Sequence, residues 1–311
     1  MDVILHLGAH RTGTRTFQAF LQANARALGV AGVAVWGPEV TRNGRFAGLR
    51  KHPDKCRGAD HRRAYRSSGV IRSALAQEER AGTRALIVSD ADMMGDQINN
   101  LTRARLYPDA RLRLERFRAA FGERAVRIAV SVRSYEAYWA SVLARALPLG
   151  AAFPDADQLD RLVTQPRRWR DVIADTSTVF PNAEVLVWPH ERLVAQPERL
   201  LALMLGAPVV GANRAARERL NMSPDTRLLA EALRDRGEAG FAAALPARGR
   251  NWRPFPPEHA QALRTEYEED LAWLRNGADG HATFIDDVGR DPRSGTEERG
   301  QHDDREAQGL G

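Results

Sequence analysis

The stretch LHLGAHRTGTRTFQAFL, Leu5–Leu21, joins a short apolar run to an amphipathic segment through a turn that contains two glycines. Val3–Leu7 is short, apolar and β-branched at its start, which predicts a buried strand. From Thr14 to about residue 28, large apolar residues recur on one helical face, which predicts a helix. A strand that leads through a glycine turn into a helix is typical of α/β folds.

Gly8 and Gly13 frame four residues, as in the phosphate-binding P-loop G-x-x-x-x-G-K-[S/T]. Backbone N–H groups of such a turn converge on an anion, and the positive end of the helix dipole favours negative charge there. Glycine has no Cβ to block close approach. The same spacing also occurs in a tight strand-to-helix turn with no ligand, and that alternative stays open here.

The loop lacks the lysine of ATP-binding P-loops. Thr14 stands where the pattern has lysine, and Arg15 where it has Ser or Thr. That lysine contacts the β- and γ-phosphates, and the hydroxyl binds Mg²⁺. Chemistry on Mg·ATP is therefore poorly supported. Arg11, a basic residue inside the turn, instead suggests a loop that holds one phosphate or sulfate group without a metal.

The remainder of the chain alternates predicted strands and helices. Further strands are expected over residues 33–36, 85–88, 126–132 and 184–188, and helices over about 14–28, 63–80, 109–121, 134–147, 197–205, 225–236 and 257–275. This alternation predicts an α/β fold, a three-layer α/β/α sandwich with a central parallel sheet. Ligands of such sheets bind beyond the carboxyl ends of the strands. Residues 37–60, rich in Gly, Pro and charge, predict a long surface loop.

The predicted domain covers residues 1–278. Residues 279–311 are polar and charged with few apolar side chains, which predicts a disordered C-terminal tail.

Composition narrows the class of partner. The 311 residues carry a formal net charge of +6, and 43% are apolar, as expected for a globular protein that binds an anion. No dense basic stripe with interleaved aromatic residues indicates nucleic acid. Cys56 is the only cysteine, so no intrachain disulfide forms. No signal peptide or membrane-spanning run is evident, and we expect a cytoplasmic protein.

Two segments resemble one known family. HLGAHRTGTRTFQ, residues 6–18, resembles the 5′-phosphosulfate-binding loop of the sulfotransferases, H-x-G-x-x-K-[S/T]-G-T-[S/T]. RIAVSVRSYEAYWAS, residues 127–141, is similar to the 3′-phosphate motif of that family, in which a strand ends in Arg and Ser follows eight residues later. Arg133 and Ser141 have that spacing. The likeness extends thinly over residues 1–275 and is strong only in these two segments.

The resemblance implies a P-loop nucleoside triphosphate hydrolase-like fold and a co-substrate, 3′-phosphoadenosine-5′-phosphosulfate, with no metal. Arg133 and Ser141 would bind the 3′-phosphate. The 5′-phosphosulfate would lie on the loop, against His10, Arg11, Thr12, Gly13, Thr14 and Arg15. The acceptor would be a hydroxyl or amine of a glycan or small metabolite.

Catalysis requires positive charge at the leaving phosphate and a base at the acceptor. Arg11 replaces the catalytic loop lysine of the family and can neutralise charge, although its guanidinium is larger and planar. Asp90 and Asp92, after the strand predicted at 85–88, are the candidate bases. The alternative is a structural role, in which Ser89 or Asp90 caps the following turn. His10 either contacts the ligand or has a structural role in the turn.

Three other segments are similar to the family more weakly. VWPHERL places His190 and Glu191 after a strand, where structural roles are expected. Residues 221–224, Asn-Met-Ser-Pro, resemble a segment common to sulfotransferase-like chains and also read as a helix N-cap ahead of Asp225. RGRNWRPF, residues 248–255, echoes the segment that covers the 3′-phosphate, with shortened spacing.

Two other functions remain open. The departures at Arg11 and Arg15 are also typical of a relative that binds the nucleotide without turnover. A P-loop kinase of small molecules is less well supported, because the lysine and the Mg²⁺-binding hydroxyl are both missing.

Overall fold

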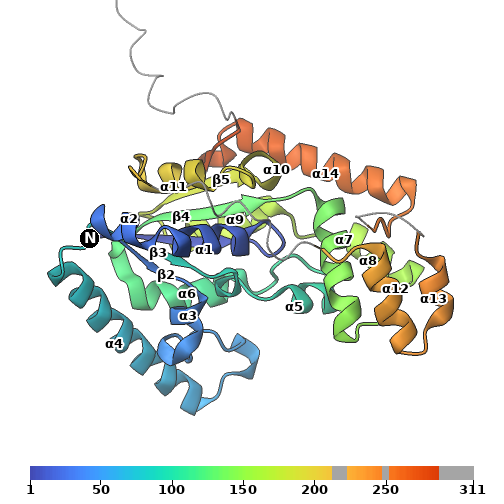
Figure 1. Ribbon diagram of the computed structural model, residues 1–311, viewed down its shortest axis with the longest axis horizontal. Coiled ribbons are helices and arrows are strands. Elements are labelled where there is room, and N and C mark those ends of the chain that lie inside the picture. The colour runs from blue at the N-terminus through green and yellow to red at the C-terminus, as the bar shows by residue number, and fades with distance from the viewer. Residues whose placement is uncertain (212–222, 247–251, 287–311) are drawn as a thin grey trace, which may run out of the picture.

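The computed structural model describes residues 1–211, 223–246 and 252–286. Its centre is one sheet of six strands in the order β2-β3-β1-β4-β5-β6, and each neighbouring pair is parallel (Figure 1). The strands are β1 Asp2–Gly8, β2 Val33–Trp36, β3 Ala85–Ser89, β4 Ala125–Val132, β5 Glu184–Pro189 and β6 Thr283–Phe284. The predicted α/β fold with a parallel sheet is confirmed.

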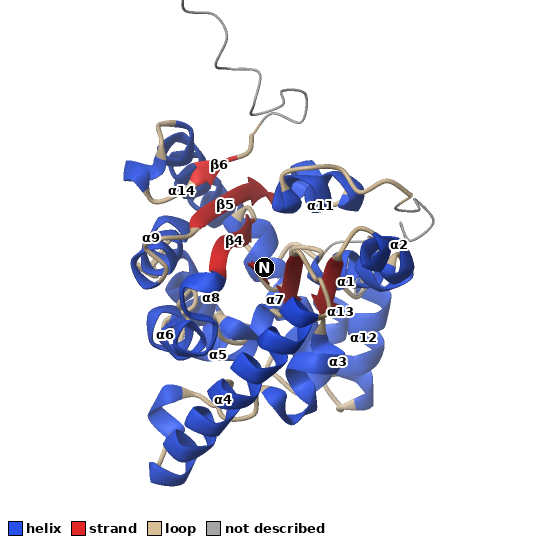
Figure 2. Cartoon of the chain, turned by 90° about the vertical axis from the view of Figure 1, so that its left-hand side faces the viewer, coloured by secondary structure: helices blue, strands red, loops and turns tan. Residues whose placement is uncertain are grey.

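Alternate residues of the strands point into two separate cores. In β1, Val3 and Leu5 join one core, and Ile4 joins the other. Figure 2 shows α1, α2 and α11 on one side of the sheet and α6 and α9 on the other. Both faces of the sheet are therefore covered, which is why its strands are almost continuously apolar.

The helices that cover the smaller core are α1 Thr14–Ala23, α2 Ala25–Val30 and α11 Pro197–Leu205. Those that contribute to the larger core include α4 Gly58–Arg80, α6 Ala110–Phe121, α7 Tyr135–Ala146, α9 Trp169–Val179 and α14 Pro257–Arg275. The other described α-helices are α3 Pro38–Val40, α5 Gln97–Thr102, α8 Ala156–Val163, α10 His190–Leu193, α12 Thr226–Asp235 and α13 Ala239–Ala244. None of the described helices combines the length and apolarity needed to cross a membrane.

Two local predictions are corrected. The helix expected over residues 14–28 is divided into α1 and α2 at Asn24, whose side-chain amide donates to the Phe20 carbonyl at 2.8 Å. A side chain that bonds to the backbone in this way competes with helix continuation. Residues 37–60 are not simply a surface loop. Phe46 and Leu49 are fully buried in the larger core, and α4 already begins at Gly58.

The fold also extends beyond the predicted domain boundary at residue 278. Thr283 and Phe284 pair with Leu186 and Val187 of β5, so the sixth strand lies in the segment that was expected to be a tail. Arg275 of α14 donates to Asp286 at 2.6 Å. The rest of the predicted tail, residues 287–311, lies outside the described residues.

Candidate functional site

The topology brings the two sulfotransferase-like segments to one rim of the sheet. β1 and β4 are neighbours, and the chain leaves them in opposite directions, from β1 towards β2 and from β4 towards β5. Ligands of open α/β sheets bind in the crevice that such a reversal creates at the carboxyl ends. The Gly8–Gly13 turn follows β1 and Arg133 follows β4, so both predicted halves of the site border this crevice.

Left-handed backbone conformations shape the turn after β1. Gly8, Arg11 and Gly13 have φ angles of 71°, 64° and 78°. At Gly8 a Cβ atom would lie 2.3 Å from Thr14 Oγ1, so only glycine fits. An arginine rarely adopts such a φ, and Arg11 is held there by its surroundings. The turn therefore has one defined backbone conformation.

Two threonines stabilise the turn from inside. Thr12 Oγ1 accepts from the Ala9 N–H at 3.1 Å and donates to the Ala9 carbonyl at 2.7 Å, and Thr14 Oγ1 donates to the same carbonyl at 3.1 Å. Both residues are buried, whereas Arg15 is exposed on the first turn of α1. The threonine hydroxyls, predicted as ligand donors, are used within the turn. The backbone N–H groups of Ala9 and His10 are also engaged, with Thr12 Oγ1 and Tyr107 Oη, so backbone donors for an anion come from the later residues of the turn.

Arg11 connects the two halves of the site. Its Nε donates to Ser141 Oγ at 2.8 Å, and its Nη2 donates to Ser223 Oγ at 3.1 Å. The two serine hydroxyls are 2.6 Å apart. Arg133 donates in turn to the Arg11 carbonyl. The predicted residues Arg11, Arg133 and Ser141 therefore form one cluster, together with Ser223, which the sequence reading assigned to a helix cap.

This cluster is basic. Burial, and then the charges of Arg133 and Arg145, lower the pKa of Arg11 to about 10. Burial also lowers the pKa of Arg133, whose Nε is buried without a hydrogen-bond partner. Within the described ranges, no carboxylate forms an ion pair with Arg11, Arg15, Arg133 or Arg145. Glu191 lies near enough to act on the Arg133 charge and partly opposes the effect of burial. Clustered guanidinium groups with unused donors and no carboxylate ion pair fit an anionic ligand.

A buried network supports the turn that carries Arg133. Trp169 Nε1 donates to the Arg133 carbonyl at 2.8 Å, and the Trp169 ring stacks on Tyr135 with 6.2 Å between centroids. The Tyr135 hydroxyl accepts from the Trp169 N–H at 2.6 Å and donates to Asp270. Asp270 is 1% exposed and also accepts from Arg170 Nε at 2.7 Å. The position of Arg133 therefore depends on α9 and α14.

The two candidate bases lie in different surroundings. Asp90 is 1% exposed and accepts from Thr41 Oγ1 at 2.6 Å and from Arg42 Nη2 at 2.8 Å. Its Oδ1 also caps the short helix Ala91–Met93 through the Asp92 N–H, at 3.1 Å. The capping contact that the sequence left as an alternative is present, and burial separates this carboxylate from any incoming acceptor.

Asp92 is partly exposed and contacts the Gly8–Gly13 turn through His10. It accepts from His10 Nε2 at 3.1 Å and from Arg50 Nη2 at 2.6 Å. Burial would raise the pKa of Asp92, but the hydrogen bond from His10 and the charges of His10, Arg42 and Arg50 outweigh it and hold that pKa well below its usual range. Asp92 is therefore a weak base that fixes its neighbours.

His10 is fixed at both ring nitrogens. Its Nδ1 lies 2.9 Å from Tyr107 Oη, which also accepts from the His10 backbone N–H at 2.8 Å, and its Nε2 faces Asp92. The contacts with Arg42, Arg50 and Tyr107 were missed from the sequence. No local motif signals them, because Arg42 and Arg50 belong to the segment expected to be a surface loop.

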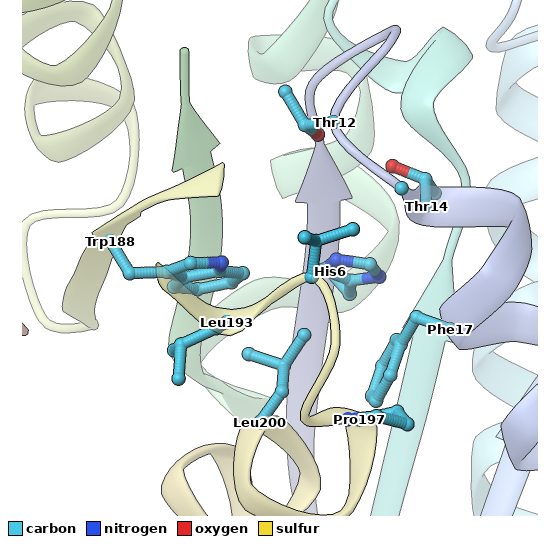
Figure 3. A pocket seen from close by; sticks show the side chains of 10 residues that line it. His6, Thr12, Thr14, Phe17, Trp188, Leu193, Pro197 and Leu200 are labelled. Atoms are coloured by element: carbon cyan, nitrogen blue, oxygen red, sulfur yellow. The ribbon is translucent and has the colours of Figure 1, made fainter. Parts of the chain in front are cut away.

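His6 lies beneath the turn rather than in it. Its Nδ1 is 2.8 Å from Ser89 Oγ, and burial lowers its pKa to about 3, so the ring stays neutral. Figure 3 shows the His6 ring with Phe17 and Trp188 around a small cavity of about 20 Å³ that reaches Thr12 and Thr14. His6 is therefore a buried core residue beneath the turn.

A larger open groove of about 580 Å³ borders the crevice on the α14 side. It is lined by residues that include Ser134, Pro189, Glu191, Arg192, Arg264 and Tyr267. Ser134 directly follows Arg133, so this groove gives bulk ligand atoms room beside the basic cluster.

His52, Asp54 and Asp109 lie close enough to one another to share a metal ion. Arg103 already contacts the two carboxylates, at 2.8 Å from Asp54 and 3.4 Å from Asp109. The guanidinium supplies the positive charge that a metal would bring. This group carries no argument for a metal centre, and the expectation of metal-free chemistry stays a prediction.

No family model, curated protein or solved structure matches the chain. The geometry and charge of the site are therefore the basis on which a function is proposed.

Proposed function

We propose that the protein binds 3′-phosphoadenosine-5′-phosphosulfate in the crevice between the Gly8–Gly13 turn and the β4–α7 turn, and transfers its sulfuryl group to a hydroxyl or amine. The observation that carries the proposal is the contact between Arg11 and Ser141, which are 130 residues apart in sequence. It joins the segment similar to a 5′-phosphosulfate loop to the segment similar to a 3′-phosphate motif. The proposal also includes a P-loop-type fold and a cytoplasmic location.

The residues present suit such a donor. Backbone N–H groups of the turn and the amino end of α1 would hold the 5′-phosphosulfate. Arg133, with its unpartnered Nε, and Ser141 would hold the 3′-phosphate. Arg11 reaches from the turn into the same cluster, where its charge would stabilise the negative charge that develops on the leaving phosphate. The acceptor would be part of a glycan or a small metabolite.

Asp92 and His10 form the pair best placed to handle the acceptor proton, because they lie beside the turn and are partly exposed. Asp92 would orient the imidazole and stabilise its charged form, as a carboxylate does beside a catalytic histidine. We assign Asp90 to the support of Arg42 and of the helix Ala91–Met93.

A relative that binds the donor without turnover is the alternative. It is favoured by the engagement of both His10 nitrogens, which leaves no free base in the absence of ligand. A small-molecule kinase has less support, because Thr14 and Arg15 replace the residues that bind the γ-phosphate and Mg²⁺.

Calorimetric titration with 3′,5′-adenosine bisphosphate, compared with ATP·Mg²⁺, tests the proposal. We expect the bisphosphate to bind and ATP·Mg²⁺ to bind at least ten-fold more weakly, because ATP lacks the 3′-phosphate. Transfer of labelled sulfate to a panel of hydroxyl and amine acceptors then separates the enzyme from the inactive relative. Preference for ATP·Mg²⁺ would contradict the proposal.

A further inference from the structure

Ser223 contacts the basic cluster although it belongs to neither sulfotransferase-like segment. It lies ahead of α12, and its Oγ is 3.1 Å from Arg11 Nη2 and 2.6 Å from Ser141 Oγ. Arg11 and Ser141 are both assigned to the donor site. The α12 helix is instead capped by Asp225, which accepts from the Leu228 N–H at 2.9 Å. Ser223 is therefore not needed as a helix cap.

The N–H and O–H donors of this cluster outnumber the acceptors around them. Both serine oxygens accept from Arg11, and one serine hydroxyl donates to the other. The second hydroxyl hydrogen and the remaining Arg11 N–H groups have no acceptor among the residues that the structure describes. A phosphate group carries only acceptors, so it complements this set of donors.

We propose that Ser223 is a third ligand of the donor 3′-phosphate, beside Arg133 and Ser141. This inference rests on the proposed function. On binding, the hydrogen bond between the two serines would be exchanged for two O–H···O bonds to the phosphate, while both oxygens continue to accept from Arg11. Ser223 would thereby make the site selective for a nucleotide phosphorylated at the 3′ position.

A structural role for Ser223 makes a different prediction. If its hydroxyl only ties the segment before α12 to Arg11, its loss would weaken every nucleotide to a similar extent or none at all. The dependence of affinity on the 3′-phosphate therefore distinguishes the two roles.

The experiment compares Ser223→Val with Ser223→Thr, which have nearly the same shape and differ in the hydroxyl. Calorimetry would measure the affinity of each for 3′,5′-adenosine bisphosphate and for adenosine 5′-monophosphate. We expect the valine variant to bind the bisphosphate roughly ten-fold or more weakly than the threonine variant, with the monophosphate changed less than two-fold. Ser73→Val is the matched control, since Ser73 is an exposed serine of α4 outside the cluster and the groove.

Equal bisphosphate affinity in the two variants, or equal losses for both nucleotides, would overturn the role of Ser223 and leave the proposed function intact. Failure of the unmodified protein to bind the bisphosphate would overturn both. If neither substitution at Ser223 folds, Ser223→Ala is compared with the unmodified protein instead. An unchanged bisphosphate affinity in Ser223→Ala would then show that the Ser223 hydroxyl adds nothing to the site.

Discussion

The indole N–H of Trp169 donates to the backbone carbonyl of Arg133 at 2.8 Å, so a residue of α9 fixes the turn that carries the central arginine of the proposed donor site. Trp169 is itself fully buried against Tyr135. Part of the proposed donor site is thus supported by the larger core.

Trp169→Phe should therefore weaken donor binding, although Trp169 is not among the residues assigned to contact the donor. Loss of one neutral hydrogen bond costs about 0.5–1.5 kcal/mol, so we expect a two- to ten-fold loss of affinity for 3′,5′-adenosine bisphosphate by calorimetry. Arg133→Ala should cost roughly ten-fold or more. Trp273→Phe is the control, because its indole donates to Asp279 at 2.7 Å instead. A Trp169 variant with unchanged affinity would remove the supporting role.

Arg11→Ala should reduce sulfate transfer far more than donor affinity, since charge on the leaving group grows mainly in the transition state. We expect transfer to fall by about 100-fold or more, measured with labelled donor, and Arg11→Lys to retain activity. Arg26→Ala, on the exposed surface of α2, makes the same change in net charge and should have no effect. Transfer that survives Arg11→Ala would rule out the assignment.

Substitutions of Asp90 and Asp92, the two aspartates after β3, should affect different properties of the protein. Asp92→Asn is expected to lower transfer by about 100-fold or more with donor affinity nearly unchanged, because His10 loses its carboxylate partner. Asp90→Asn should instead lower the free energy of unfolding by about 1–3 kcal/mol, because buried contacts with Thr41 and Arg42 weaken. Urea unfolding and transfer assays check both. A larger catalytic loss at Asp90 would reverse the two roles.

Gly8→Ala should abolish bisphosphate binding. The new Cβ would lie 2.3 Å from Thr14 Oγ1 and would require a left-handed alanine. Gly82→Ala isolates the second effect, since Gly82 has φ 84° with no atom near its Cβ position. That control should lose about 1–2 kcal/mol of stability and keep full affinity. Similar behaviour of the two variants in calorimetry and thermal unfolding would argue against a rigid turn.

His6 should make the protein sensitive to acid. Its pKa in the folded state is about 3, below the ordinary value of 6.5, so the unfolded chain takes up the proton first. This contribution to stability is complete above pH 6.5 and decreases by about 1.4 kcal/mol for each pH unit between 6.5 and about 3. His6→Gln should flatten the slope of unfolding free energy against pH, whatever its effect on absolute stability. An unchanged slope in His6→Gln would contradict this role of His6.

Much of the fold could be predicted from the sequence because the relevant signals are local. Val33–Trp36 is a short apolar run, and the helices Pro197–Leu205 and Pro257–Arg275 begin with a proline at the first helical position. Helix α8, with Asp155 as its N-cap, and helix α9 were missed. So was β6, whose two residues become a strand only by pairing with β5.

The position of the candidate site on the sheet could be predicted from the sequence. Most of its side-chain contacts could not. The order of strands and helices places the turn and Arg133 on one rim. The direction of the Arg11 side chain, the pairing of His10 with Asp92 and the presence of Ser223 arise from residues distant in sequence. No local periodicity encodes such contacts.

The central place of β1 in the sheet also bears on how the protein folds. β1 pairs with β3 and β4, whose first residues are Ala85 and Ala125, so closing the crevice requires long loops to close first. A fragment that ends before β4 would carry the Gly8–Gly13 turn without Arg133 and the turn that follows β4. Conversely, a ligand bound between the two turns would stabilise the native sheet by mass action. The bound donor would then increase the free energy of unfolding of the whole chain.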